Sequence, residues 1–370
     1  MIDAQSGPGP SKPFPAAVSP REYNVRIEPQ GRTLKVGENR SVLEVALAAG
    51  LNVPHSCKSG HCASCRARLV SGEIHYPNGR TAGLTADEAK QGYILMCQAR
   101  PRSDLKLEAR IIANAYEAEI KTLPCRIASM NLLAPDVMQV FLRLPAVEPL
   151  QFRAGQYLDV LLDGGRRRSF SIASPPHDSQ LVEIHARRVP GGGFTGALFD
   201  KLRTGSLLRI EGPIGQFIYR DSQAPALMIA GGTGFAPLKS MLRHALEKGS
   251  TRRFHLYWGA RQGVDLYEEA LALDWARQYS NFSFTAVLSA ATADDVTSEH
   301  RRLGWVHEAA LADFPDLSKF DIYTAGPPAL IEAIRASFPK RGVPEDRLHF
   351  DSFDYAPDSQ QTLSNATDHV

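Results

Sequence analysis

The sequence predicts a multidomain protein in which an α+β domain is followed by an antiparallel β-barrel and then by a doubly wound α/β domain with a parallel sheet. Two observations carry this prediction. The chain has 370 residues, and single hydrophobic cores rarely extend beyond about 250 residues. The expected elements also change in character twice along the chain, from a mixed region to closely spaced strands, and then to strands that alternate with helices.

The expected boundaries follow from these changes and from the composition of the two ends. Residues 1–20 contain five prolines and few large apolar side chains, which is typical of a disordered leader, and residues 354–370 are similarly polar. Between these ends we expect a first domain at 21–112, a linker at 113–120, a barrel at 121–222 and an α/β domain at 223–353.

The first domain is expected to be a compact unit with strands at 23–28, 32–36 and 104–111. Residues 41–50, SVLEVALAAG, predict a helix because apolar side chains recur at helical spacing and a glycine follows them.

Four cysteines of this domain form the strongest motif of the sequence. Cys57, Cys62 and Cys65 have the spacing C-x4-C-x2-C and are followed by Cys97, a pattern typical of a plant-type 2Fe-2S cluster, whose irons need four thiolates. Small residues in the loop allow a tight turn with N–H groups directed at the sulfurs. A structural zinc site is the alternative, but such sites usually use two C-x2-C pairs.

A Rieske centre would need two histidine ligands in particular positions. His55 and His61 do not supply that pattern, and we expect both at the surface. Cys125 opens a predicted strand far from the loop, where a small buried apolar residue is the better interpretation.

Composition narrows the class of protein. Lys plus Arg total 42 against 40 for Asp plus Glu, a formal charge of +2, so charge gives no reason to expect a nucleic-acid or membrane partner. The sequence shows no long apolar stretch and no secretory signal, so we expect a cytoplasmic protein. Five cysteines in a reducing compartment favour metal binding over a disulfide framework.

The barrel is predicted from short strands separated by turns, with one helix at 196–202. Its expected strands are 124–133, 137–144, 155–165, 167–174, 181–189 and 207–217.

One of these strands, RRSFSIAS, carries a possible ligand motif. Alternation places Arg168 and Phe170 on one face, with Ser171 beside them. A guanidinium suits a pyrophosphate and an aromatic ring suits a flat flavin ring. A charged barrel strand with one core phenylalanine is an equal alternative for this stretch taken alone.

A glycine-rich helix start, RRVPGGGFTGALF, favours the ligand interpretation. It places Gly192, Gly193, Phe194 and Thr195 where free N–H groups and the helix dipole attract a phosphate.

The α/β domain is predicted from strands at 226–232, 254–260, 282–289 and 320–326 that alternate with helices at 236–249, 267–279 and 328–342. The first strand runs into Gly231, Gly232, Thr233 and Gly234, and Pro237 follows in the helix. A strand, a glycine turn and a helix in succession form a crevice in which backbone can approach a pyrophosphate.

These motifs together resemble a known family. CKSGHCASC and GYILMCQARP resemble the β-grasp 2Fe-2S ferredoxin domain at the N-terminus of bacterial iron–sulfur flavoprotein reductases. The Arg-x-Phe-Ser and Gly-Thr-Gly-x-x-Pro stretches resemble the FAD and pyridine-nucleotide domains of the ferredoxin–NAD(P)+ reductase superfamily. Phe170 stands where that superfamily usually has Tyr, and Ala325 where it often has Cys.

The resemblance implies roles for individual residues. Arg168 would hold the FAD pyrophosphate, and Phe170 and Ser171 would be the catalytic contacts to the flavin ring. Arg261, Gly326 and Pro327 would belong to the nucleotide site. Phe353 would cover the second flavin face, and a core aromatic is an equal alternative for this residue.

NADH is expected rather than NADPH, because Asp294 and Asp295 follow the strand that ends at Ser289, whereas a 2′-phosphate would favour a basic cluster. Arg261 could reverse this preference.

The implied function is electron transfer from NADH through FAD and the 2Fe-2S cluster to a partner enzyme, by a chain expected to be monomeric. KTLPCRI, RRRSFSIA and VPGGGFT resemble CDP-6-deoxy-3,4-glucoseen reductases, which serve a deoxysugar dehydrase. The alternative is the reductase component of a mono- or dioxygenase, which has the same domain order. A non-enzymatic carrier or a zinc-binding module is the alternative of another class.

Overall fold

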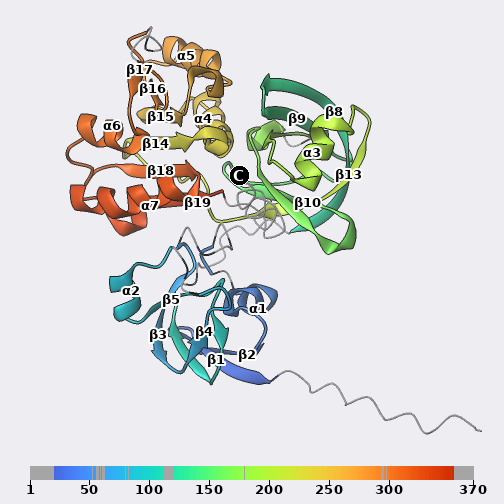
Figure 1. Ribbon diagram of the computed structural model, residues 1–370, viewed down its shortest axis with the longest axis vertical. Helices are drawn as coiled ribbons and strands as arrows, with labels where there is room; N and C mark the ends of the chain where they lie inside the picture. Colours follow the sequence, from blue (N-terminus) through green and yellow to red (C-terminus); the bar gives the residue numbers. More distant parts are fainter. Residues whose placement is uncertain are drawn as a thin grey trace, which may run out of the picture.

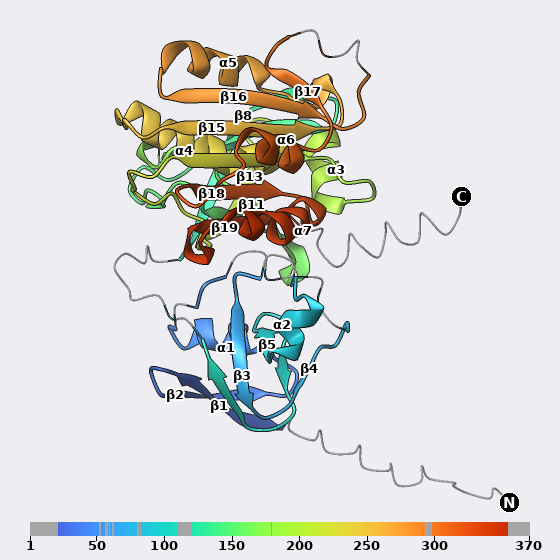
Figure 2. The same cartoon turned by 90° about the vertical axis from the view of Figure 1, so that its left-hand side faces the viewer.

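The computed structural model describes residues 21–51, 53–55, 58, 60, 63–79, 81, 83–109, 111, 120–178, 180–292, 296 and 298–353. Figures 1 and 2 show three parts, with the first domain placed against the other two and the barrel beside the α/β domain. Each part has its own buried apolar cluster. The predicted combination of an α+β domain, an antiparallel barrel and a doubly wound domain is confirmed. The boundaries between domains stay predictions.

The first domain is a five-stranded mixed sheet in the order β2-β1-β7-β3-β5. Its strands are β1 (Glu22–Glu28), β2 (Arg32–Gly37), β3 (Arg66–Ser71), β5 (Tyr93–Leu95) and β7 (Leu105–Glu108), with a separate pair β4 (Ile74–His75) and β6 (Arg100–Pro101). The helices are α1 (Val42–Ala48) and α2 (Ala86–Lys90). The Ser41 hydroxyl caps α1, and Thr85 and Glu88 form a capping box on α2.

The barrel is a six-stranded antiparallel sheet in the order β11-β10-β13-β8-β9-β12. Its strands are β8 (Lys121–Ala134), β9 (Val137–Arg143), β10 (Tyr157–Leu161), β11 (Arg167–Ser171), β12 (Leu181–Arg187) and β13 (Leu207–Ile214). A bridge between Ile172 and Ile184 joins the two ends of the sheet and closes it. Cys125 is buried in β8, as predicted, and burial raises the pKa of its thiol to about 12.

The helix α3 (Gly193–Asp200) begins three residues before the predicted start at 196. The structure therefore places Gly193, Phe194 and Thr195 inside the helix, and the Gly192 backbone at its N-cap.

The α/β domain is a six-stranded parallel sheet in the order β17-β16-β15-β14-β18-β19. Its strands are β14 (Ala226–Gly231), β15 (Phe254–Ala260), β16 (Phe282–Leu288), β17 (Arg301–Leu303), β18 (Asp321–Gly326) and β19 (Leu348–Ser352). Its helices are α4 (Phe235–Glu247), α5 (Glu269–Gln278), α6 (Val306–Asp313) and α7 (Pro328–Ser337).

Helices cover both faces of this sheet. The buried side chains of α4 and α5 belong to one apolar cluster, and those of α6 and α7 to another. The chain runs from β14 outward to β15 and β16, and later returns to place β18 on the other side of β14. The carboxyl ends of β14 and β18 therefore form the switch point at which such sheets bind ligands.

Among the described residues, no helix is long and apolar enough to cross a membrane.

Candidate functional site

Two of the four predicted cluster ligands lie in the described part of the chain, and the structure brings them together. Cys65 precedes β3 and Cys97 follows β5, and the Met96 N–H donates to the Cys65 carbonyl at 3.1 Å. Both side chains are buried, with 3% and 7% of their surface exposed. Cys57 and Cys62 lie outside the described residues, so the complete ligand set stays a prediction.

The described residues between Cys57 and Cys65 have a backbone conformation that fits a cluster. Lys58 and Ala63 both have φ of 55°, which residues other than glycine rarely adopt. Gly60 has φ of 89°, and a Cβ there would lie 2.9 Å from the side chain of Gln98. The Gln98 amide donates to the Lys58 carbonyl at 2.7 Å, which ties the loop to the residue after Cys97. Left-handed residues turn successive N–H groups toward one side, as the sulfurs of a cluster require.

The cluster loop faces the barrel. His55, expected at the surface, is in fact buried with 6% of its surface exposed, and its carbonyl accepts from the Gln216 N–H at 3.3 Å. The Lys58 ammonium lies 5.9 Å from the centre of the Tyr157 ring in β10. The expectation for His55 was wrong because the sequence does not show that another domain covers it; His61 lies outside the described residues.

The strand β11 presents the predicted flavin residues as alternation requires. Arg168 and Phe170 lie opposite Val160 and Leu158 of β10, on one face of the sheet. The Phe170 ring centre is 5.7 Å from that of Phe194, the second residue of α3. The predicted residues of the strand and the helix therefore meet. Contact of Arg168 with a pyrophosphate stays a prediction.

The start of α3 is shaped by a glycine. The Thr195 hydroxyl accepts from the Val189 N–H at 3.1 Å, and a Cβ on Gly192 would lie 2.7 Å from that hydroxyl oxygen. Thr195 keeps its own O–H to donate to a ligand. Gly193 follows as the first helical residue, where a backbone N–H has no partner within the helix. These residues fit a phosphate of FAD.

The glycines after β14 allow two strand ends to approach closely. Gly326 has φ of 149°, and a Cβ there would lie 3.0 Å from the backbone of Gly231. A Cβ on Gly234 would overlap the Ala325 carbonyl. Gly232 has φ of 54°, which turns the chain from β14 into the start of α4. The crevice is thus lined by backbone, which fits a dinucleotide pyrophosphate.

Three other predicted residues lie at this crevice. Thr233 follows Gly232 in the short turn before α4, and Pro237 lies in the first turn of α4. Pro327 is the N-cap of α7, directly after Gly326.

Arg187, which the sequence did not identify, adds a cation to the crevice. Its Nε and one terminal nitrogen are buried without a hydrogen-bond partner among the described residues, and Asp136 is 3.6 Å from Nε. Its guanidinium lies 3.6 Å from the place where a Cβ on Gly232 would stand. A partly buried guanidinium with two nitrogens that make no hydrogen bond among the described residues, beside a helix N-terminus, fits a phosphate. The neighbouring Arg188 instead pairs with Asp200 at 2.8 Å.

Asp351 is a second residue that the sequence did not identify. The Ser171 hydroxyl donates to its carboxylate at 3.3 Å, which joins the barrel to β19. Both side chains are buried, at 8% and 5% exposure. Two residues later, the Phe353 N–H donates to the Gly326 carbonyl at 2.8 Å, so Phe353 lies beside the nucleotide crevice. Cover of the flavin by Phe353 stays a prediction.

Arg261 follows β15, and its guanidinium lies 3.3 Å from the Asp265 carboxylate. Asp265 is buried and also accepts from the Gln262 N–H at 3.3 Å. The Arg261 side chain is 67% exposed, and exposed ion pairs of this kind are weak. Asp294 and Asp295 lie outside the described residues.

A buried charged network connects the barrel to the α/β domain. The Lys239 ammonium of α4 donates to Glu183 of β12 at 2.8 Å and to Glu268 at 2.6 Å. His185 lies 2.9 Å from Glu183 and 3.0 Å from the Tyr267 hydroxyl. Burial alone would raise the pKa of Glu183, but the hydrogen bond with His185 and the charge of Lys239 lower it to about 2.

Glu183, His185 and Glu268 have donor atoms within 4.8 Å of one another, as a metal site would. Lys239 already supplies a positive charge to both carboxylates. We therefore interpret the network as an ion-paired contact between domains.

Comparison with known families and proteins agrees with these three sites. Residues 25–102 match the 2Fe-2S iron–sulfur cluster binding domain, 124–219 the oxidoreductase FAD-binding domain and 228–336 the oxidoreductase NAD-binding domain. The cofactors are thus a 2Fe-2S cluster, FAD and NAD(H), and the predicted NAD(P)H-dependent oxidoreductase is confirmed over the carrier and zinc alternatives.

Full-length relatives have the same domains. The chain is 37% identical to the CDP-6-deoxy-L-threo-D-glycero-4-hexulose-3-dehydrase reductase of Yersinia pestis, over 89% of this chain and 98% of that protein. It is 35% identical to the phenol 2-monooxygenase reductase component DmpP of a Pseudomonas strain, over 84% and 88%. The solved Amycolatopsis cytochrome P450 reductase GcoB is 32% identical and superposes with a TM-score of 0.70, over 90% and 98%. The chain therefore belongs to the family of iron–sulfur flavoprotein reductases that join 2Fe-2S, FAD-binding and NAD-binding domains and deliver electrons to a partner enzyme.

Proposed function

We propose that this reductase passes electrons from NADH to a dehydrase that acts on a CDP-linked deoxyhexulose. The observation that carries the proposal is the 37% identity over 98% of the Yersinia reductase, whose name states such a partner. NADH is proposed over NADPH because Asp294 and Asp295 follow Ser289 in the sequence, where a 2′-phosphate would favour basic residues. Because NADH is an intracellular reductant, we also propose a cytoplasmic location.

The proposed roles of the residues follow from the geometry. Cys57, Cys62, Cys65 and Cys97 hold the cluster, and Arg168, Gly192, Gly193, Phe194 and Thr195 hold the FAD phosphates and the adjacent part of the flavin. FAD, when bound, takes up a hydride from NADH and returns the electrons singly to the cluster. Phe170 and Phe353 pack on the flavin ring, and the Ser171 hydroxyl, which donates its proton to Asp351, presents its oxygen as an acceptor at the edge of the ring. Gly231, Gly232, Thr233, Gly234, Pro237, Gly326 and Pro327 place the nucleotide.

The test compares acceptors and donors with the purified holoenzyme. A CDP-6-deoxyhexulose dehydrase with its substrate should increase NADH oxidation by about tenfold over the rate in air alone, and NADPH should be a poorer donor by about tenfold. The same assay should contain an oxygenase component as the second acceptor.

The oxygenase alternative rests on the 35% identity to the phenol 2-monooxygenase reductase. Faster coupled oxidation with the oxygenase component than with the dehydrase would favour this alternative and contradict the dehydrase proposal.

A further inference from the structure

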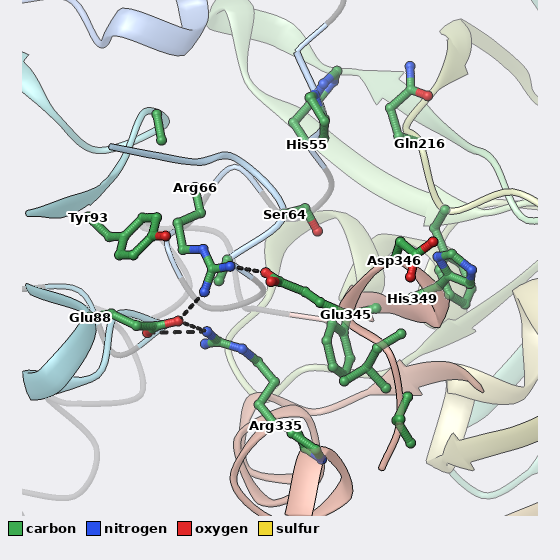
Figure 3. Close-up of a pocket in the computed structure, with 18 of the residues that line it drawn as sticks. His55, Ser64, Arg66, Glu88, Tyr93, Gln216, Arg335, Glu345, Asp346 and His349 are labelled. Carbon is green, nitrogen blue, oxygen red and sulfur yellow. Dashed lines mark hydrogen bonds and ion pairs between the residues drawn. The ribbon is translucent and has the colours of Figure 1, made fainter. Parts of the chain in front are cut away.

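Ion pairs join the first domain to the α/β domain. A cavity of about 680 Å³ lies where the three domains meet, and Figure 3 shows it lined by Arg66 and Glu88 of the first domain and by Arg335, Glu345 and other residues of the α/β domain. Charged side chains of the two domains pair with one another at this cavity.

Glu88 is the centre of these interactions. The Arg335 guanidinium donates to the Glu88 carboxylate at 3.0 Å and to the Gly83 carbonyl at 2.5 Å. Arg66 reaches the same Glu88 oxygen at 2.5 Å and also pairs with Glu345. The side chains of Arg335, Glu88 and Arg66 are only 14%, 16% and 23% exposed. Ion pairs shielded in this way are less screened by salt than pairs at an open surface.

The ion pairs join the segment that carries a predicted cluster ligand to the last turn of α7. Arg66 directly follows the predicted ligand Cys65, and Arg335 is on α7, whose N-cap Pro327 adjoins the crevice. Figure 2 shows α7 and β19 on the side of the α/β domain that faces the first domain. The same docking presents the cluster loop to the barrel, through His55 and Lys58.

We propose that Glu88 and Arg335 are positioning residues for electron transfer from flavin to cluster. Their ion pair holds the first domain in the arrangement in which the cluster loop faces the barrel. Electron-transfer rates depend steeply on distance, so a loosened first domain receives electrons more slowly although each cofactor site is intact. This inference rests on the internal electron path proposed above and is independent of the acceptor.

The variants are chosen to preserve local structure. Glu88→Gln keeps a side chain that can complete the capping box with Thr85. Arg335→Gln removes the charge from the other partner. Arg335→Lys keeps the charge but loses the planar guanidinium, which can donate to two acceptors at once. The matched controls are Asp87→Asn, an exposed carboxylate of the same helix, and Arg341→Gln, an exposed arginine of the same domain.

The experiment uses stopped-flow spectroscopy of the holoenzyme, in which NADH reduces the flavin and cluster bleaching is followed. Each single Gln variant should slow cluster bleaching by about tenfold, which corresponds to about 1.4 kcal/mol, and the double variant should be no slower than either single variant. Arg335→Lys should recover part of the rate. Direct ferricyanide reduction by the flavin, and the controls, should stay within about twofold of wild type.

Two further readouts separate positioning from a general structural role. The wild-type rate should fall modestly between about 0.05 and about 0.5 M NaCl, because the pairs are only partly shielded, and Arg335→Gln, which keeps only the pairs of Arg66, should lose a smaller fraction of its rate over this range. Small-angle scattering should give a larger radius of gyration for both Gln variants than for the controls. Equal bleaching rates and equal radii in variants and wild type would overturn the inference, whereas failure of NADH to bleach the wild-type cluster would instead overturn the internal electron path.

Discussion

Replacement of Lys239 by methionine tests the interpretation of the buried network between the barrel and the α/β domain. The side chain of Lys239 is 4% exposed and lies between Glu183 and Glu268. Methionine fills a similar volume but leaves the Glu183 carboxylate buried without its cation. Removal of one partner of a buried ion pair costs about 3–5 kcal/mol.

The lowered pKa of Glu183 gives a similar free energy for the ionised carboxylate in this network. Its value falls from 4.5 to about 2 in the folded protein, and at about 1.4 kcal/mol per pKa unit this corresponds to about 3 kcal/mol. Because the folded pKa is lowered, this contribution is complete above pH 4.5 and is lost as the pH falls toward 2. In Lys239→Met the carboxyl keeps the hydrogen bond with His185 but loses the charge of Lys239, so its pKa rises from the wild-type value and part of this contribution is lost.

The assay is urea unfolding followed by tryptophan fluorescence. All three tryptophans, Trp258, Trp275 and Trp305, are in the α/β domain, so the signal reports on the domain that carries Lys239. The variant should lose about 3 kcal/mol at pH 7, and the loss should shrink as the pH falls from 4.5 toward 2. The exposed Lys248→Met, just after the same helix, should change stability by less than about 0.5 kcal/mol. A loss below about 1 kcal/mol for Lys239→Met, or a loss independent of pH, would refute the reasoning.

Three other predictions concern the cofactor sites. Arg168→Ala should leave the visible spectrum of the cluster intact but reduce flavin content after gel filtration by about tenfold, and full flavin content would contradict its role. Arg187→Gln should raise the KM for NADH by about tenfold with little change in kcat, because a charged hydrogen bond contributes about 1.5–3 kcal/mol; an unchanged KM would show that the guanidinium does not touch the nucleotide. Cys62→Ser should abolish electron delivery to the partner while NADH–ferricyanide activity persists, and loss of both activities would indicate a folding role for the cluster.

The local parts of this molecule were predictable from the sequence. The cysteine spacing identified the cluster loop, and the strand–glycine–helix order identified the nucleotide crevice, because both depend on residues that are close along the chain. The alternation that placed Arg168 and Phe170 on one face is likewise a property of a single strand.

The features that the sequence did not predict depend on pairs of residues that are far apart along the chain. Ser171 and Asp351 are separated by 180 positions, and Glu88 and Arg335 by 247. Periodicity carries no information about such pairs, since it describes one element at a time. The short helix α2 could have been found, because Thr85 and Glu88 form a capping box that is visible in the sequence.

The cluster loop faces the barrel, and this orientation has a consequence for steady-state kinetics. His55 and Lys58 approach the barrel, so a partner protein that binds this same face competes with the barrel for it. Reduction of the cluster by the flavin and its oxidation by the partner would then alternate. Excess partner would bind molecules whose cluster is still oxidised and would block its reduction. For such a partner, turnover plotted against partner concentration should rise, pass through a maximum and decline; a simple hyperbola would mean that electrons leave by another face.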